Sequence, residues 1–193
     1  MYAGTIRAPP PCQTSEVASL KGQLLVAAPT LLDPNFSRTV VLIAEHSPEG
    51  ALGVVLNRGS DLAVADSAPE LDDLVEPGDA VFVGGPVEPS GIVVLAEFED
   101  PGEAVAVAFS DIGFLGESRP AAGTRRARVF AGHAGWAPGQ LDAEIAGDGW
   151  ILDPATREDV FASEPDGLWN AVLARKGGRY ALLSRMPADP RMN

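Results

Sequence analysis

The sequence predicts a single domain of the α+β class. Its 193 residues suit one domain, and 46% of them are hydrophobic, which is enough to build an independent core. Many short apolar runs bounded by glycine or proline indicate strands, whereas only two segments have a convincing helical period. No repeat of fixed period is present, which argues against a solenoid.

The chain is expected to have three parts. Residues 1–20 are interpreted as a flexible N-terminal arm, because three prolines at 9–11 precede polar residues with no sustained period. Residues 21–187 form the α+β domain, and residues 188–193 form a short C-terminal tail. Cys12 is the one cysteine, so no intramolecular disulfide can form, and we interpret it as an exposed thiol without a functional role.

The domain is expected to begin with a strand over Gln23–Ala28 and a β-hairpin. The apolar runs Thr39–Ala44 and Ala51–Leu56 flank the tetrapeptide SPEG at 47–50. Proline at the second turn position presets φ near −65°, and glycine at the fourth suits a type I turn. Polar residues lie at both ends of this hairpin, where a functional site could form.

The rest of the domain is expected to combine short strands with two main helices. The expected elements are, in chain order, one short helix or two helical turns within Leu62–Leu74, interrupted by Pro69, strands over Ala80–Val83, Ile92–Ala96, Val105–Phe109 and Arg126–Ala131, a helix over Pro138–Ala146, a strand over Trp150–Leu152, a helix over Leu168–Ala174 and a last strand over Tyr180–Ser184. Ile92–Ala96 and Val105–Phe109 are expected to pair through the acidic loop Glu97–Glu103. The loop Arg119–Thr124 is expected to be mobile.

The charge balance limits the classes of partner. A formal net charge of −13 argues against broad binding of nucleic acid or anionic membranes, whose phosphates would be repelled. Arg125, Arg126 and Arg128 form the one basic cluster, which we interpret as the solvated entrance of a strand. No apolar run approaches the ~20 residues of a membrane helix, and the N-terminus lacks the apolar core of a signal peptide. We therefore expect a cytoplasmic location.

Separated motifs in a fixed order resemble the bacterial YqgE/AlgH family. The match extends over about residues 21–187. The motifs are DPNFSRT at 33–39, Glu45-His46 with Gly50 and Gly53, Asn57-Arg58, VGGPV at 83–87 and GHAGWAPGQLDAEI at 132–145. The sequence departs from the family pattern at Gly59, where proline is usual, and at His133, to which we assign no catalytic role.

The resemblance implies a fold and a label but no reaction. It implies a compact α+β domain around a mixed, partly barrel-like sheet with two or three helices. The family is commonly labelled as a transcriptional regulator because of a genetic link to alginate production. No established enzymatic activity comes with the name, and no cofactor is implied.

The leading hypothesis is a regulatory or binding module that recognises a small anionic ligand or a protein partner. Arg38 would pair with the anion, the glycine-rich turns Gly84–Pro86 and Gly132–Gln140 would donate N–H groups, and Trp136 would shield the contact. The expected ligand-binding residues are Asp33, Asn35, Arg38, His46, Asn57, Gly84, Gly85, Gly135, Trp136 and Gln140.

The alternative is a hydrolase-like enzyme with His46 as general base and Ser37 or Thr39 as nucleophile, with Asp33 as partner. Strand alternation places Glu45 and His46 on opposite faces, and no nucleophile-elbow pattern surrounds either hydroxyl. A purely structural interpretation is also open, in which Asp33 and Asn35 shape a turn and Arg38 ties the loop.

Two further classes of function are not expected. The helix over Pro138–Ala146 carries no cation, and no helix-turn-helix pattern is present, so direct DNA binding is not predicted. The histidines and carboxylates show no local spacing typical of metal ligands, so no metal site is predicted.

Overall fold

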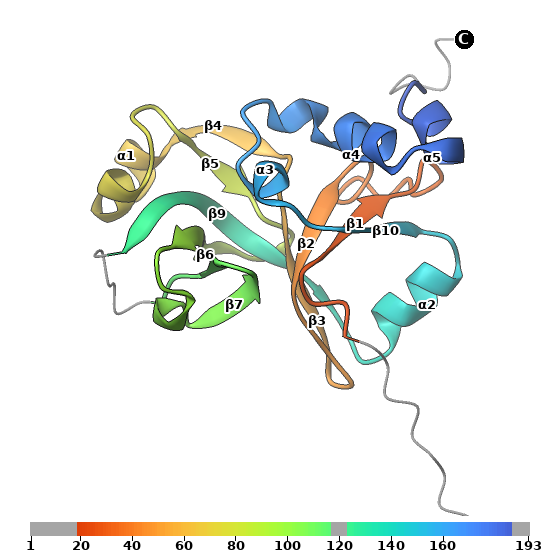
Figure 1. Ribbon diagram of the computed structural model, residues 1–193, viewed down its shortest axis with the longest axis horizontal. Helices are drawn as coiled ribbons and strands as arrows, with labels where there is room; N and C mark the ends of the chain where they lie inside the picture. The colour runs from red at the N-terminus through yellow and green to blue at the C-terminus, as the bar shows by residue number, and fades with distance from the viewer. Residues whose placement is uncertain (1–18, 117–122, 187–193) are drawn as a thin grey trace, which may run out of the picture.

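A computed structural model describes residues 19–116 and 123–186. The expectations for the N-terminal arm, for Cys12, for the C-terminal tail and for most of the loop Arg119–Thr124 lie outside these residues. The structure confirms the α+β class (Figure 1). No helix in the described part of the chain is long and apolar enough to span a membrane.

The strands and helices alternate irregularly along the chain. The strands are β1 Gln23–Ala27, β2 Val40–Ser47, β3 Gly50–Val55, β4 Gly59–Ala63, β5 Ala80–Val83, β6 Val87–Phe98, β7 Ala106–Phe109, β8 Ile112–Phe114, β9 Thr124–Trp136 and β10 Trp150–Pro154. The α-helices are α1 Val64–Ser67, α2 Gln140–Ala146, α3 Arg157–Val160, α4 Leu168–Lys176 and α5 Gly178–Leu183, and the 3-10 helices are η1 Pro69–Leu74, η2 Pro101–Glu103 and η3 Pro165–Gly167.

The sheet is mixed and is not closed into a barrel. Its main path runs β10-β1-β2-β3-β9-β6-β8-β7, and β5 joins it parallel to β9 and antiparallel to β4. The long strand β9 is shared by the two ends of the molecule (Figure 1). Its first ten residues pair with β6, and its last three pair with β3.

Three apolar clusters form the core. One lies between the sheet and α4, and includes Phe130 and Trp169. The second lies beside α2 around Trp136 and Trp150, and the third lies under α1 and η1 around Phe98. Leu168, Trp169, Val172 and Leu173 face inward, which confirms the expected amphipathic helix. Burial on this scale is the main force that holds the open sheet together.

Most of the expected elements are present, and the hairpin is confirmed with Ser47 opposite Gly50. The expected strand over Tyr180–Ser184 is wrong, because these residues continue into α5 after Gly177 and Gly178 take positive φ at the end of α4. The segment is made of helix-favouring residues and packs on α4, which outweighs its short apolar pattern.

The expected pairing of Ile92–Ala96 with Val105–Phe109 is also wrong. Strand β8 lies between them, and it pairs with β6 on one side and β7 on the other. Strand β6 continues through Glu97 to Phe98, so the first part of the expected acidic loop is strand. Similarly, β9 extends to Trp136, so Gly132–Gly135 is strand and not a turn before a helix.

Candidate functional site

The motif loop, defined as residues 33–39 with Asn57 and Arg58, is closed by its own hydrogen bonds. The Asp33 carboxylate accepts from the Asn35 N–H at 2.7 Å, which forms an Asx turn. The Thr39 hydroxyl donates to the Phe36 carbonyl at 2.8 Å, and its side chain is fully buried. These contacts shape the turn into β2.

Asn57 and Arg58 attach the end of the hairpin to the motif loop. The buried Asn57 amide accepts from the Val40 N–H at 2.8 Å and donates to the Arg38 carbonyl at 2.9 Å. Arg58 donates to the carbonyls of Pro34 and Ser37. Burial lowers the pKa of Arg58 from its ordinary value, and the Asp33 carboxylate acts in the opposite direction. Both side chains therefore satisfy backbone groups.

Arg38, the expected anion contact, is held by groups of the chain itself. Its backbone has a positive φ of 55°, its guanidinium lies 4.5 Å from the centre of the Trp169 ring, and it donates to the Met186 carbonyl at 2.6 Å. The side chain thus ties the motif loop to α4 and to the segment that follows α5.

Gly84 and Gly85 serve a close crossing of backbones. A Cβ on Gly84 would lie 2.2 Å from the Gly132 carbonyl oxygen, and one on Gly85 would lie 2.2 Å from the His133 carbonyl carbon. The Gly84 N–H donates to Ala131 and its carbonyl accepts from Val55. Steric necessity therefore explains both glycines, and the backbone groups of Gly84 are already hydrogen-bonded.

Trp136 and Gln140 belong to an aromatic and carboxylate cluster beside α2. Glu144 accepts from the indole N–H groups of Trp136 and Trp150 at 3.0 and 2.8 Å, and from the Gln140 amide at 2.9 Å. The Phe36 ring contacts both indoles. Gly135 lies opposite Leu52 in the sheet. This cluster is packed core with its polar groups paired.

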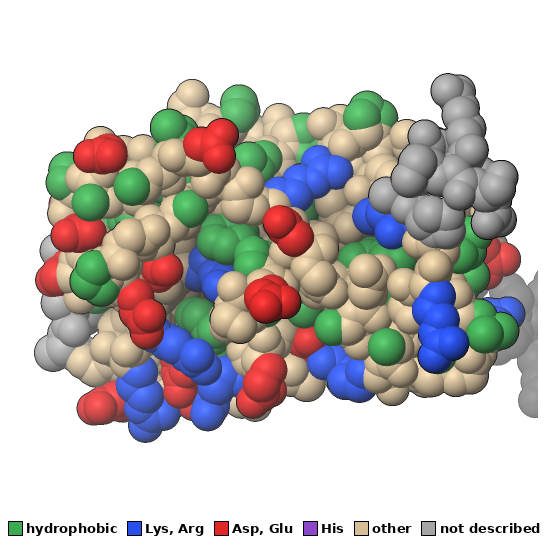
Figure 2. Space-filling view, turned by 90° about the horizontal axis from the view of Figure 1, so that it is seen from above, with side chains coloured by type: hydrophobic (Ala, Val, Ile, Leu, Met, Phe, Trp, Pro, Cys, Tyr) green, Lys and Arg blue, Asp and Glu red, His purple; other side chains and the backbone are tan. Residues whose placement is uncertain are grey.

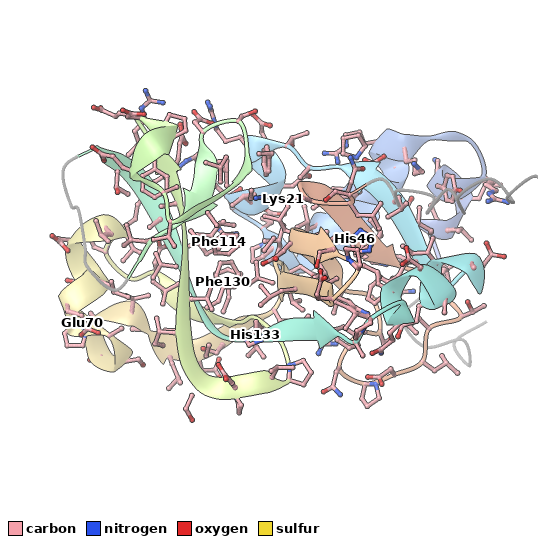
Figure 3. The ribbon with its side chains drawn as sticks, turned by 90° about the horizontal axis from the view of Figure 1, so that it is seen from below. Lys21, His46, Glu70, Phe114, Phe130 and His133 are labelled. Carbon is pink, nitrogen blue, oxygen red and sulfur yellow. The ribbon has the colours of Figure 1, made fainter. Side chains whose placement is uncertain are left out.

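His46 lies near the far end of β2 from the motif loop. Only 5% of its side chain is exposed, its Nδ1 accepts from the Leu20 N–H at 3.2 Å, and its Nε2 lies 3.7 Å from an Asp142 carboxylate oxygen. Glu45 is exposed, in agreement with the expected alternation. Figure 3 shows His46 and His133 on different strands, β2 and β9.

The structure does not bring the expected hydrolase residues together. Thr39 precedes His46 by seven residues, and this length of extended strand corresponds to roughly 23 Å. The other expected ligand-binding residues likewise fall into separate groups: the motif loop, the β5–β9 crossing and the cluster beside α2. Among the described residues, no group of three or more His, Cys, Asp or Glu side chains is placed to hold a metal ion.

A different set of residues lines a cleft of about 610 Å³ over β9, between the segment 73–80 and the segment 161–165. We call it the arginine cleft. Figure 2 looks onto this side of the molecule, which is hollowed toward one end. The residues that line the cleft are Gly59, Asp73, Leu74, Val75, Glu76, Gly78, Asp79, Ala80, Phe82, Arg125, Arg126, Ala127, Arg128, Phe161, Ala162, Ser163 and Pro165.

Arg126 is oriented in this cleft by two contacts. Its Nε donates to the Glu97 carboxylate at 2.8 Å, and its guanidinium carbon lies 4.0 Å from the centre of the Phe161 ring. The side chain is 44% exposed. In the described part of the chain, its two terminal amino groups donate to no other residue. Arg126 therefore presents a fixed guanidinium edge, the geometry that binds carboxylate or phosphate in a bidentate manner.

Glu97 is the anchor for this arrangement. Its side chain is 6% exposed and lies directly opposite Arg126 in the β6–β9 pair. Arg125 Nη1 and Arg157 Nε approach its other oxygen at 3.4 and 3.5 Å. A buried carboxylate needs such partners. Arg125 and Arg157 also pair with Asp111, so three arginines surround two carboxylates, and one positive charge is left over for a ligand.

Arg128 and Asp111 extend the charged network in opposite directions. Arg128 donates to the carbonyls of Val160 and Ala162 at 2.7 and 2.9 Å, and its guanidinium lies over the Phe82 ring. Burial lowers the pKa of Arg128 from its ordinary value. Asp111 accepts from Arg157 at 2.6 Å, and this hydrogen bond lowers the pKa of the Asp111 carboxyl. Arg128 thus fixes the 160–162 wall of the cleft to its floor.

The Phe161 wall is also held from the helix side. Thr156 and Asp159 form a capping box at the start of α3, which ends immediately before Phe161. Arg175 of α4 donates to Asp159 at 2.7 Å, and this bond raises the pKa of Arg175. The wall that stacks on Arg126 is therefore fixed before any ligand arrives.

Sequence reasoning found the three arginines but not the cleft. The interpretation as a solvated strand entrance missed Glu97, which it placed in a loop, and Phe161, which no motif includes. The available signal was alternation: Arg126 and Arg128 are two residues apart on one strand, so they share a face with Phe130.

A second cavity, of about 490 Å³, lies between β10 and α5. Lys176, Arg179 and Tyr180 are among the residues that line it.

Comparison with known proteins identifies the family. The model of a family described as AlgH-like matches residues 24–181. A UPF0301 protein from Thermobifida fusca is 41% identical, with 91% of this chain and 96% of that protein covered, and one from Streptomyces coelicolor is 40% identical, with 93% and 98% covered.

Two solved structures resemble this fold. A crystal structure of a Corynebacterium diphtheriae protein has a TM-score of 0.79 at 32% identity, and covers 86% of this chain and 91% of its own. The solution structure of the AlgH protein from Pseudomonas aeruginosa has a TM-score of 0.68 at 27% identity, with 95% and 98% covered. The chain therefore belongs to the AlgH-like family, in agreement with the resemblance in its motifs.

Proposed function

We propose that this chain is a binding module for a small anionic ligand, held in the arginine cleft. The observation that carries the proposal is Arg126, which lines the cleft and whose guanidinium is held by Glu97 and Phe161, while its terminal amino groups donate to no other residue in the described part of the chain. A donor that is already oriented loses little conformational entropy when it binds, so its hydrogen bonds contribute more to affinity. The cleft volume falls within the range of small-molecule sites.

A regulatory role, as the family's label suggests, would then depend on the bound ligand and not on direct DNA binding. The chain carries a net charge of −13, and its arginines lie in a cleft whose lining also includes Asp73, Glu76 and Asp79. A duplex would need a continuous basic surface to offset the repulsion of its phosphates. A carboxylate or a single phosphate group needs only one oriented guanidinium.

The test is calorimetric titration of the full chain with citrate, malonate and inorganic phosphate, in the wild type and in Arg126→Gln. We expect saturable binding of at least one anion, with the affinity at least about tenfold lower in Arg126→Gln, because loss of a charge-assisted hydrogen bond costs on the order of 1.5–3 kcal/mol. Arg185→Gln is the matched control, since it makes the same charge change at an exposed position outside the cleft.

Either of two results would contradict the proposal. One is the absence of binding of all three anions. The other is equal weakening in Arg126→Gln and Arg185→Gln, which would mean that the anions respond to overall charge and not to the cleft. A thermal melt of each variant, run without ligand, checks that both are folded.

A further inference from the structure

The wall of the arginine cleft formed by residues 73–80 is acidic. Asp73, Glu76 and Asp79 line it, and all three are exposed. Asp73 lies in η1, and Glu76 and Asp79 lie in the turn between η1 and β5, whose Phe82 underlies Arg128. This turn is internally fixed, because the Asp79 carboxylate accepts from the Glu76 N–H at 3.1 Å and the Asp79 N–H donates to the Glu76 carbonyl at 3.0 Å.

Glu76 and Asp79 of the acidic wall line the same cleft as Arg126 and Arg128. The Asp79 carboxylate acts to raise the pKa of Arg128, against the effect of burial, so the two groups lie within electrostatic range. Yet no ion pair within 4.0 Å joins Glu76 or Asp79 to Arg126 or Arg128 in the described chain. The cleft therefore holds opposite charges on separate walls with space between them.

We infer that the ligand of this cleft is a small zwitterion, whose anionic group pairs with Arg126 and whose ammonium group pairs with Glu76 and Asp79. The inference rests on the proposed function and narrows its ligand class. A simple anion gains from Arg126 but binds less tightly because of the acidic wall, and a simple cation gains from the acidic wall but binds less tightly because of the arginines. A molecule with both charges gains from both walls, and orientation across the cleft follows from the charges alone.

The test uses triglycine as a probe, with two blocked forms. N-Acetyl-triglycine lacks the ammonium group, and triglycine amide lacks the carboxylate. Titration of the full chain should give the tightest binding for the free peptide, with a loss of about fivefold on either modification, the scale of one partly exposed ion pair.

Variants assign each end of the probe to its wall. Glu76→Gln combined with Asp79→Asn should weaken free triglycine about fivefold and leave N-acetyl-triglycine unchanged or tighter. Glu76→Gln alone should give part of the same effect without touching the Asp79 turn. The matched control is Glu70→Gln with Asp72→Asn, which removes the same charge from η1 at exposed positions that do not line the cleft (Figure 3 labels Glu70).

The outcomes separate this inference from the proposed function. If citrate or phosphate binds through Arg126 while acetylation of triglycine changes nothing, the zwitterion is wrong and the anion site stands. If triglycine binds equally to wild type and Arg126→Gln, the probe lies elsewhere and the inference is overturned. If no anion and no peptide binds, both proposals fail together.

Discussion

The motif loop and the arginine cleft are both rich in polar side chains, but they use them in different ways. In the motif loop, the side chains of Asn57 and Arg58 end on backbone groups of the same loop and its strand. In the cleft, Arg126 is held at one nitrogen and over one aromatic ring, and its terminal amino groups donate to no other described residue. The first arrangement stabilises a turn, whereas the second leaves hydrogen-bond donors for the proposed ligand.

This difference separates a motif that identifies the family from the cleft in which we propose the ligand site. The motif loop is distinctive in sequence because seven of its residues are consecutive, at 33–39, and Asn57 and Arg58 that bind it are adjacent to each other. The cleft draws on β5, β6, β9, the turn before β5 and the segment after α3. Its residues come together only when the sheet has formed.

The largest effect is expected at the β5–β9 crossing, where Gly84→Ala should lower the free energy of unfolding by at least about 3 kcal/mol. The added Cβ would lie 2.2 Å from the Gly132 carbonyl, so the strands would have to separate. Urea unfolding measures the loss. Gly167→Ala is the control, because it has open space around the added atom. A loss under about 1 kcal/mol would reopen a ligand-binding role for Gly84.

The second largest effect is expected for Asn57→Ala, which should lower the free energy of unfolding by about 2 kcal/mol. The change leaves the Val40 N–H and the Arg38 carbonyl without their partner in a buried position. The exposed Asn35 of the same loop serves as the control, and Asn35→Ala should cost less than about 0.5 kcal/mol. Similar losses for the two variants would show that the loop is not held together by Asn57.

Arg38→Gln should cost about 1 kcal/mol of stability and leave citrate affinity unchanged. The guanidinium contacts the Trp169 ring and the Met186 carbonyl, so its loss is structural. Arg38→Gln should change the free energy of unfolding but not the citrate affinity, whereas Arg126→Gln should change the citrate affinity. Urea unfolding and calorimetric titration of both variants therefore distinguish the two regions. Weaker citrate binding in Arg38→Gln would return the anion site to the motif loop.

The smallest effect is a pH dependence at the edge of the cleft. The hydrogen bond from Arg157 holds the pKa of Asp111 below its ordinary value, so the folded chain favours the ionised form. The contribution of Asp111 to the free energy of unfolding is complete above the pKa that this carboxyl has in the unfolded chain. It is lost as pH falls through the lower pKa that the carboxyl has in the folded chain. Asp111→Asn should therefore melt slightly below wild type at pH 7, and the two melting temperatures should converge below about pH 3. A difference that persists at pH 3 would assign the effect to packing.

Part of this picture could be predicted from the sequence, and the rest depends on contacts between distant segments. Strand alternation and turn residues predicted the hairpin, and helical spacing predicted the inward face of α4. The pairing of β6 with β8 could not be predicted, since the three-residue β8 carries almost no periodic signal. Glu97 looked like a loop acid because its burial depends on three arginines 28 to 60 residues away in the chain.

For the candidate site too, local motifs could be recognised in the sequence but contacts between distant segments could not. The expected ligand-binding residues were chosen from motifs, and the motif residues proved to be paired within the fold. The α+β class was predicted correctly. The expected turn over Gly132–Gln140 was wrong in its first part, because β9 continues through Gly132–Gly135 to meet β3. Glycine there permits close packing of strands, which a sequence cannot distinguish from a flexible loop.

The central claim is that the arginine cleft, and not the motif loop, binds the ligand. The most direct test is an NMR titration of the ¹⁵N-labelled chain with citrate. The account predicts shifts that saturate at the amides of residues 76–80, 125–128 and 161–163 and at the Arg126 Nε–H, with the amides of residues 33–39, 57 and 84–85 unmoved. Shifts confined to the motif loop, or no saturating shift at all, would contradict it.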